Sequence, residues 1–209
     1  MNRKIDSKSA ITNRSRIPSA KNDRLVLVES MLERDMALRL EFATGILFYK
    51  EQPHTFKVDL DGKVINATPD FEVGWDAWET EYIEVKFARK TRQAKTANRL
   101  GAIKRQLEAE GLSYAVMTEK EIRGSNQVLQ NCMYLNPFKW RSRYRADNLK
   151  SQIPSGPVTF KRWAEKLEDA QKVVELIAHQ FVFCDFYQRI TPDTVIRPIE
   201  DGDFGYMYA

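Results

Sequence analysis

Thr68-Pro69-Asp70-Phe71 and Tyr82-Ile83-Glu84-Val85-Lys86 are the segments that decide the fold of this chain of 209 residues. We interpret Asp70 as the acid at the end of one strand, and the second segment as another strand that follows it. Side chains two residues apart on a strand point to the same face, so Glu84 and Lys86 project together. If the two strands pair as neighbours, Asp70 comes to the same edge of the sheet. The sequence therefore predicts a patch with two carboxylates and one ammonium group.

Such a patch has the groups that metal-dependent cleavage of a phosphodiester requires. Carboxylate oxygens hold a hard divalent ion, and a cation faces the scissile phosphate. Neither Cys132 nor Cys184 has histidine or cysteine partners at zinc spacing. Ligation by oxygen alone therefore favours Mg²⁺ or Mn²⁺ over zinc. A solvated charge pair on an edge strand is the alternative interpretation of Glu84 and Lys86.

A basic segment follows the second strand and points to a polyanionic partner. The net charge of the whole chain is only +4, but residues 85–107 contain eight basic side chains and no acid. We expect a helix over residues 91–110 with Arg92, Lys95 and Arg99 on one face. Together with Lys90, these side chains are candidates for contacts to a DNA backbone. A solvated helix surface is the alternative interpretation.

Apolar periodicity and turn signals predict an α/β fold. The expected elements are a helix over 30–42, an apolar run at 46–49, a strand at 54–60 that turns at Asp61-Gly62, a return strand that begins at 64–65 and runs towards Phe71, a strand at 82–87, the helix over 91–110, a strand at 114–117 and a short helix at 128–134. The core face of the 91–110 helix is predicted to carry Ala97, Leu100, Ile103 and Leu107. Residues 1–24 are basic and weakly patterned, and we interpret them as an N-terminal arm.

The C-terminal quarter has the pattern of a small second module. Pro154, Ser155, Gly156 and Pro157 form the best linker candidate. Beyond it we expect helices over 159–167 and 170–181 and a hairpin formed by 181–187 and 195–199, an order that suits a helix-turn-helix or winged-helix module. The tail after Glu200 is acidic and aromatic. It is either a docking peptide for a partner or a simple chain end.

The composition excludes some classes of protein. The chain is 43% hydrophobic and 30% charged, as globular proteins are. It lacks the apolar run of a signal peptide and any stretch long enough to span a bilayer. We expect Cys132 and Cys184 to be reduced structural thiols, and the protein to be soluble and cytoplasmic without a membrane partner.

Five motifs together resemble those of TnsA-type transposon endonucleases, which belong to the PD-(D/E)xK nuclease superfamily. They are Glu29-Ser30-x-Leu32-Glu33-Arg34-Asp35, Glu51-Gln52-Pro53, Thr68-Pro69-Asp70-Phe71, Glu84-Val85-Lys86 and Thr118-Glu119-Lys120-Glu121-Ile122. The resemblance covers residues 25–135. It implies a restriction-endonuclease-like core, a mixed sheet flanked by helices, over residues 25–150. It also implies a small helical, winged-helix-like domain over residues 151–209.

The resemblance assigns roles to individual residues. It implies that Glu33 is the acid carried by the first helix, that Asp70 is the principal metal ligand and that Glu84 is the second strand acid. Lys86 corresponds to the catalytic lysine, and the backbone carbonyl of Val85 to a further ligand of Mg²⁺ or Mn²⁺. On periodicity alone, Asp35 and Glu41 are rivals of Glu33 for the helix-borne acid.

The resemblance also implies partners and a biological process. Proteins of this type cut the 5′ ends of a transposon in double-stranded DNA during cut-and-paste transposition. A DDE transposase, TnsB, acts on the 3′ ends, and an AAA+ regulator, TnsC, controls both; the setting is the bacterial cytoplasm. Two alternatives stay open from the sequence: a stand-alone restriction-type or junction-resolving nuclease, and a DNA-binding regulator whose nuclease-like domain has lost activity.

Overall fold

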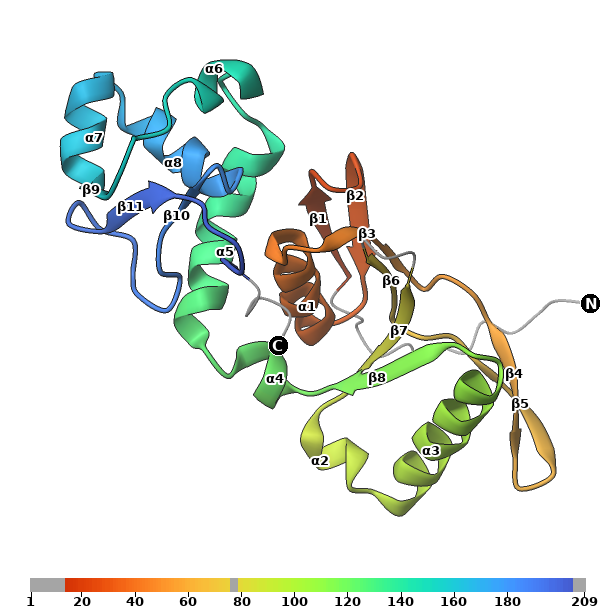
Figure 1. Cartoon of the computed structure of the whole chain (residues 1–209). Helices are drawn as coiled ribbons and strands as arrows, with labels where there is room; N and C mark the ends of the chain where they lie inside the picture. The colour runs from red at the N-terminus through yellow and green to blue at the C-terminus, as the bar shows by residue number, and fades with distance from the viewer. Residues whose placement is uncertain (1–13, 76–78, 205–209) are drawn as a thin grey trace, which may run out of the picture.

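A mixed sheet flanked by helices forms the centre of the protein, in a computed structural model that describes residues 14–75 and 79–204 (Figure 1). Within these ranges the sheet has four strands in the order β3 (Ile46–Glu51), β6 (Phe71–Trp75), β7 (Thr80–Val85) and β8 (Ser113–Met117). The β3–β6 and β6–β7 pairs are antiparallel, and β7 and β8 are parallel. The predicted α/β class is therefore confirmed, and β6 and β7 pair as neighbours, which is the condition under which Asp70 is expected to reach Glu84 and Lys86.

The two faces of the sheet pack against different elements. Helix α1 (Met31–Phe42) lies over one face, where Leu32, Met36 and Leu40 join Phe71 and Ile83 in the larger hydrophobic cluster. Ser30 caps this helix by accepting a hydrogen bond from the backbone N–H of Glu33, in agreement with the predicted start. The opposite face is covered by a smaller hydrophobic cluster. This cluster joins helix α3 (Ala94–Ala109) to the projecting hairpin of β4 (Phe56–Leu60) and β5 (Lys63–Ala67) (Figure 1).

The β4–β5 hairpin forms as its turn residues predict. Strands β4 (Phe56–Leu60) and β5 (Lys63–Ala67) pair around Asp61 and Gly62, both of which have positive φ. These left-handed conformations suit the Asp-Gly sequence of a two-residue hairpin loop. The prediction that the returning strand runs on to Asp70 is wrong, because β5 ends at Ala67 and β6 starts separately at Phe71. Asp70 thus lies in the short link between two strands that belong to different sheets.

The predicted basic helix is two helices. Helix α2 (Ala88–Thr91) stops before Gln93, whose extended backbone separates it from α3 (Ala94–Ala109). The core side chains of α3 include Leu100, Ile103 and Leu107 as predicted. The prediction for Ala97 is wrong, because this residue lies in the first turn of α3, outside the smaller hydrophobic cluster, and is exposed.

A hairpin replaces part of the predicted N-terminal arm. Strands β1 (Ser15–Ser19) and β2 (Arg24–Val28) pair antiparallel, and Ile17 and Val26 are buried. Both strands pack against α1, and β1 also packs against helix α5 (Asn126–Trp140). The boundary at residue 24 is therefore wrong, because alternating burial along these strands makes them part of the folded body. Residues 1–13 of the predicted arm lie outside the described part of the chain.

The C-terminal part, residues 151–204, has the predicted order of elements. It comprises β9 (Val158–Thr159), α7 (Phe160–Leu167), α8 (Ala170–Ala178), β10 (Val182–Phe183) and β11 (Val195–Pro198). Three helices lie between the central sheet and this part: α4 (Glu119–Arg123), α5 (Asn126–Trp140), which is longer than the helix predicted at 128–134, and α6 (Ala146–Lys150). The β-strands form a small sheet in the order β10-β11-β9. Two helices followed by a hairpin are therefore present.

This C-terminal part shares its core with the rest of the protein. Helix α5 packs against both α1 and α8, and the ring of Phe42 on α1 lies 6.0 Å from that of Phe186. Cys132 and Cys184 are free and buried there, and burial raises the pKa of each thiol to about 12. The tail is packed as far as the buried Phe204, and residues 205–209 lie outside the described part.

Candidate functional site

Asp70, Glu84 and Lys86 meet at the start of β6 and the end of β7. The β6–β7 register pairs Phe71 with Ile83, which brings the preceding Asp70 beside the end of β7. The Asp70 Oδ2 atom accepts a hydrogen bond of 2.6 Å from the backbone N–H of Val85. Lys86 Nζ lies 2.6 Å from Glu84 Oε1 and 4.0 Å from Asp70 Oδ2. The predicted patch of two carboxylates and one ammonium group is present.

The link before Asp70 is fixed by its neighbours. The backbone carbonyl of Asp70 accepts a hydrogen bond of 2.9 Å from the N–H of Gln52, and the hydroxyls of Thr55 and Thr68 lie 2.7 Å apart. Gln52 has a positive φ of 43°, which turns the chain at the end of β3 so that its N–H reaches Asp70. Asp70 is therefore fixed by two hydrogen bonds, one to its backbone carbonyl from Gln52 and one to its carboxylate from Val85.

The electrostatics of the site favour the binding of a cation. Burial, and then the negative charge of Glu84, raise the pKa of Asp70 from 3.8 to about 7, although Lys86 and the Val85 N–H act in the opposite direction. Burial alone would lower the pKa of Lys86, but Glu84 and Asp70 outweigh it and raise that pKa. Lys86 therefore stays an ammonium ion, while one lysine is not enough to offset two partly buried carboxylates.

Among the three acids of α1, Glu33 is the one whose charge acts on this cluster. It raises the pKa values of Asp70 and Lys86 further, and its Oε2 accepts a hydrogen bond of 2.8 Å from the N–H of Glu29. Asp35 is buried and paired with Arg34 and Arg123. Glu41 is buried and accepts hydrogen bonds from the hydroxyls of Ser19 and Tyr49. The two rivals of Glu33 thus have structural partners.

The donor set suits a hard divalent ion held by few protein ligands. Within residues 14–75 and 79–204, no three Asp, Glu, His or Cys side chains lie close enough together to hold a metal ion. Mg²⁺ commonly binds through one or two carboxylates and keeps several water molecules. Asp70 and Glu84 fit that requirement, and a bound cation would offset both the burial and the repulsion from Glu84 that raise the pKa of Asp70. Direct ligation by Glu33 and by the Val85 carbonyl remains a prediction.

Tyr114 is a neighbour of the site that the sequence pattern did not single out. It is 5% exposed, and among the described residues its hydroxyl has no hydrogen-bond partner. In the parallel β7–β8 register Tyr114 pairs with Tyr82, which places it on the same face of the sheet as Glu84. Burial, and then Glu84 and Asp70, raise the pKa of the phenol. The sequence predicted that Tyr114 begins a strand at 114–117. Its position near the carboxylates depends on the pairing of β8 with β7, which the sequence did not predict.

The candidate DNA-binding side chains are exposed but do not share one helix face. Lys90 ends up on α2, Arg92 follows it, and Lys95 and Arg99 lie on α3. Arg99 donates a hydrogen bond of 3.0 Å to the carbonyl of Asn66 on the β4–β5 hairpin. Among the described residues the other three make no ion pair. The predicted i, i+3, i+7 stripe is wrong because the chain breaks at Gln93.

Two of the sequence motifs have structural roles. Glu51 accepts hydrogen bonds of 2.7 and 2.6 Å from the guanidinium of Arg24, which tie the β1–β2 hairpin to β3. Thr118 and Glu121 form a capping box at the start of α4. Glu119 accepts a hydrogen bond of 2.7 Å from the N–H of Ala88, so α4 also fixes the start of α2.

No model of a protein family matches the chain, and no curated protein matches its sequence. In the part of the chain that the structure describes, no helix has the length and apolar character needed to cross a membrane. The cluster of Asp70, Glu84 and Lys86 and the five sequence motifs are therefore the features that point to a function.

We expect Asp70→Asn to stabilise the metal-free protein at alkaline pH. The folded state raises the pKa of Asp70 from 3.8 to about 7, so ionising this group costs folding free energy and wild-type stability falls as the pH rises through that window. Asparagine cannot ionise, so above pH 7 the substitution should raise the free energy of unfolding by about 1–3 kcal/mol. This gain should disappear towards pH 4, where Asp70 is largely protonated in both the folded and the unfolded state. Urea unfolding in EDTA at pH 5 and pH 8 measures the difference. Equal gains at both pH values would show that the effect is not the ionisation of Asp70.

We expect Tyr114→Phe to leave stability unchanged or to raise it by about 1 kcal/mol. The hydroxyl has no partner among the described residues, so its removal breaks no hydrogen bond and relieves a buried unsatisfied group. Chemical denaturation without a divalent ion measures this. A loss of more than about 1 kcal/mol would mean that the hydroxyl is hydrogen-bonded in solution.

Proposed function

We propose that this protein is a Mg²⁺-dependent DNA endonuclease that cuts the 5′ ends of a transposon as one subunit of a heteromeric transposase. The observation that carries the nuclease chemistry is the cluster of Asp70, Glu84 and Lys86. The resemblance of the five motifs to TnsA-type endonucleases supports the biological role. In this proposal the central sheet and its helices are a restriction-endonuclease-like core, and the C-terminal part is a winged-helix-like extension of it.

Each member of the cluster has a chemical role in this proposal. A divalent ion bound at Asp70 and Glu84, with Glu33 nearby, would neutralise the charge that develops on the phosphate and would activate a water molecule. Asp70 is preorganised by the Val85 N–H and by the backbone bond to Gln52. Lys86 is a poor general base, because its neighbours raise its pKa. Its ammonium group is instead suited to orient the attacking water or to face the phosphate.

The DNA path follows from the charges around the cluster. Lys90, Arg92 and Lys95 are exposed and free of ion pairs among the described residues, so they are available to DNA phosphates. The β4–β5 hairpin is held to α3 by Arg99 and by the 2.7 Å hydrogen bond from Asn98 to Asp61. We propose that DNA lies along α2 and the start of α3, so that a phosphate reaches Lys86.

A strand-mapped cleavage assay tests the proposal. Duplex DNA that carries the transposon ends is labelled on each strand in turn and incubated with Mg²⁺, Mn²⁺ or EDTA, with and without a DDE transposase of TnsB type and a TnsC-type regulator. We expect cuts at the 5′ ends only with a divalent ion and with the transposase present. Efficient cutting without a partner would favour a restriction-type or junction-resolving nuclease. Binding with no cutting under any condition would favour an inactive regulator.

A further inference from the structure

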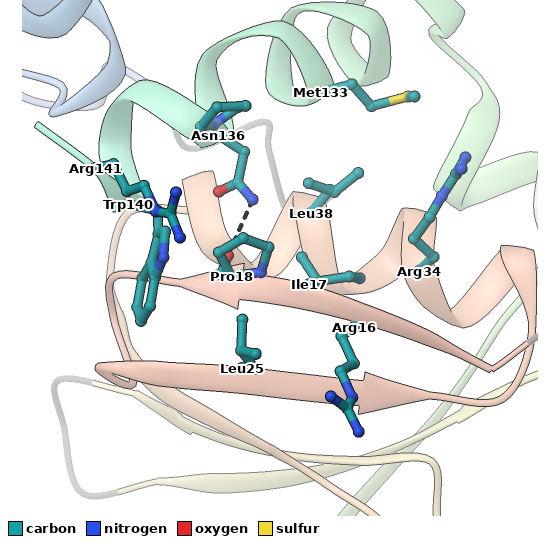
Figure 2. A pocket seen from close by; sticks show the side chains of 11 residues that line it. Arg16, Ile17, Pro18, Leu25, Arg34, Leu38, Met133, Asn136, Trp140 and Arg141 are labelled. Atoms are coloured by element: carbon teal, nitrogen blue, oxygen red, sulfur yellow. Dashed lines mark hydrogen bonds between the residues drawn. The ribbon is translucent and has the colours of Figure 1, made fainter.

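A preformed apolar groove lies away from the carboxylate cluster, between the β1–β2 hairpin, α1 and α5 (Figure 2). It has a volume of about 430 Å³, within the range of ligand-binding sites. Its lining is mostly aliphatic, with one aromatic ring: Ile17, Pro18, Leu25, Leu38, Met133 and Trp140. The nuclease chemistry proposed above uses none of these residues.

The walls of the groove are held in place, and two of its apolar side chains, Leu25 and Met133, are exposed. Asn136 on α5 donates a hydrogen bond of 2.9 Å to the carbonyl of Pro18 on β1, which joins the two walls (Figure 2). Leu25 is 48% exposed and Met133 is 44% exposed. Exposed apolar side chains gathered around a fixed groove are typical of a surface that a partner covers.

Arginines stand around this apolar lining. Figure 2 shows Arg141 beside Trp140 at one end, and Arg16 and Arg34 towards the other. Arg34 is paired with Asp35, at 2.6 Å. Arg16 and Arg141 are exposed and make no ion pair within the described ranges of the chain. Two uncompensated guanidinium groups therefore flank the groove, and their natural complement is a carboxylate or phosphate.

We propose that this groove binds a short acidic peptide segment of a partner protein, with aliphatic or aromatic anchors against the lining and carboxylates on Arg16 and Arg141. Apolar anchors in a groove with charges at its rim are the recurring arrangement of peptide recognition. A single-stranded nucleic acid fits the charges equally well but needs several planar faces for base stacking, whereas Trp140 is the one ring in the lining. The proposal does not depend on the nuclease activity.

The test uses the full chain and a library of random 12-residue peptides displayed on phage. Enriched peptides are synthesised with a fluorescent label, and their Kd is measured by fluorescence polarisation. We expect enrichment of peptides in which Asp or Glu flank Leu, Ile, Phe or Trp. Their Kd should rise about tenfold or more in Arg16→Glu/Arg141→Glu, since charge reversal turns attraction into repulsion. Leu25→Lys should weaken binding as well, because it places a charge on the apolar wall.

Matched controls separate the groove from general basic attraction. Lys57→Glu/Lys63→Glu changes the net charge by the same amount at exposed positions on the β4–β5 hairpin, which does not line the groove, and should leave the Kd within twofold or threefold. Asp70→Ala should also bind the peptides normally, even if it cannot cut DNA. Peptides without acids, or peptides whose binding ignores the groove variants, would overturn the proposal. Preferential binding of the oligonucleotide dT12, lost in the same groove variants, would overturn it in favour of a nucleic-acid site.

Discussion

Asp70→Ala should reduce Mg²⁺-dependent cleavage of transposon-end DNA by roughly 10³-fold or more, a loss of about 4 kcal/mol in transition-state stabilisation. The reason is that Asp70 is the carboxylate fixed most firmly at the site, through the Val85 N–H on its side chain and Gln52 on its backbone. The rate is measured on end-labelled duplexes with the partner transposase present and the protein saturating. DNA binding, measured by electrophoretic mobility shift, should stay within about threefold of the wild type.

Two further variants show whether this loss belongs to the cluster. Glu84→Ala should cause a smaller loss, because its side chain is held only by Lys86 among the interactions described, and a water molecule can replace its oxygen. Glu72→Ala removes an acid of β6 that forms no ion pair with Lys86, and this variant should cut at close to the wild-type rate. If Asp70→Ala cleaves as fast as Glu72→Ala, the metal-dependent nuclease proposal is wrong, whatever the fate of the peptide groove.

Glu41→Ala should destabilise the protein by about 3–5 kcal/mol, the largest effect on stability that we expect from one substitution. Glu41 accepts hydrogen bonds of 2.7 Å from Ser19 Oγ and 3.1 Å from the hydroxyl of Tyr49, and others from the backbone N–H groups of Ala20 and Lys21. Its Oε1 lies 3.6 Å from Nζ of Lys139, whose side chain is 10% exposed. Alanine would leave the hydroxyls of Ser19 and Tyr49 without this acceptor. It would also remove the counterion of the Lys139 ammonium, which would keep only the neutral carbonyls of residue 41 and Gln180. Urea unfolding at pH 7 measures the loss.

A second substitution identifies the cause of that loss. Burial lowers the pKa of Lys139, and Glu41 counteracts this, so Lys139 depends on Glu41 to keep its charge. Lys139→Met in the Glu41→Ala background should recover about 1–2 kcal/mol, because it removes the unpaired buried charge. Glu33→Ala is the matched comparison on the same helix: it should cost no more than about 1–2 kcal/mol of stability, for the loss of its bond to Glu29, and mainly reduce cleavage. Equal stability losses for Glu33→Ala and Glu41→Ala would contradict these assignments.

Local patterns predicted much of the fold. Ser30 predicted the start of α1 and Asp61-Gly62 predicted the β4–β5 turn. The strands predicted at 82–87 and 114–117 correspond to β7 and β8. The errors fall where tertiary contacts override local pattern. Residues 15–19 look polar, yet Ile17 and Ser19 are fully packed against α1 and α5. Gln93 carries no strong helix-breaking signal, yet it interrupts the basic helix.

The sequence by itself determined the α/β class and the shared face of Glu84 and Lys86, because strand and helix periods act over a few residues. Only the tertiary structure decided which acid of α1 acts on the cluster. It also placed Tyr114 beside the carboxylates and formed the groove between β1, α1 and α5. These features depend on contacts between residues far apart in the chain. The burial of these residues and the charges around them are set by tertiary packing, so the local periodicity of the sequence cannot predict them.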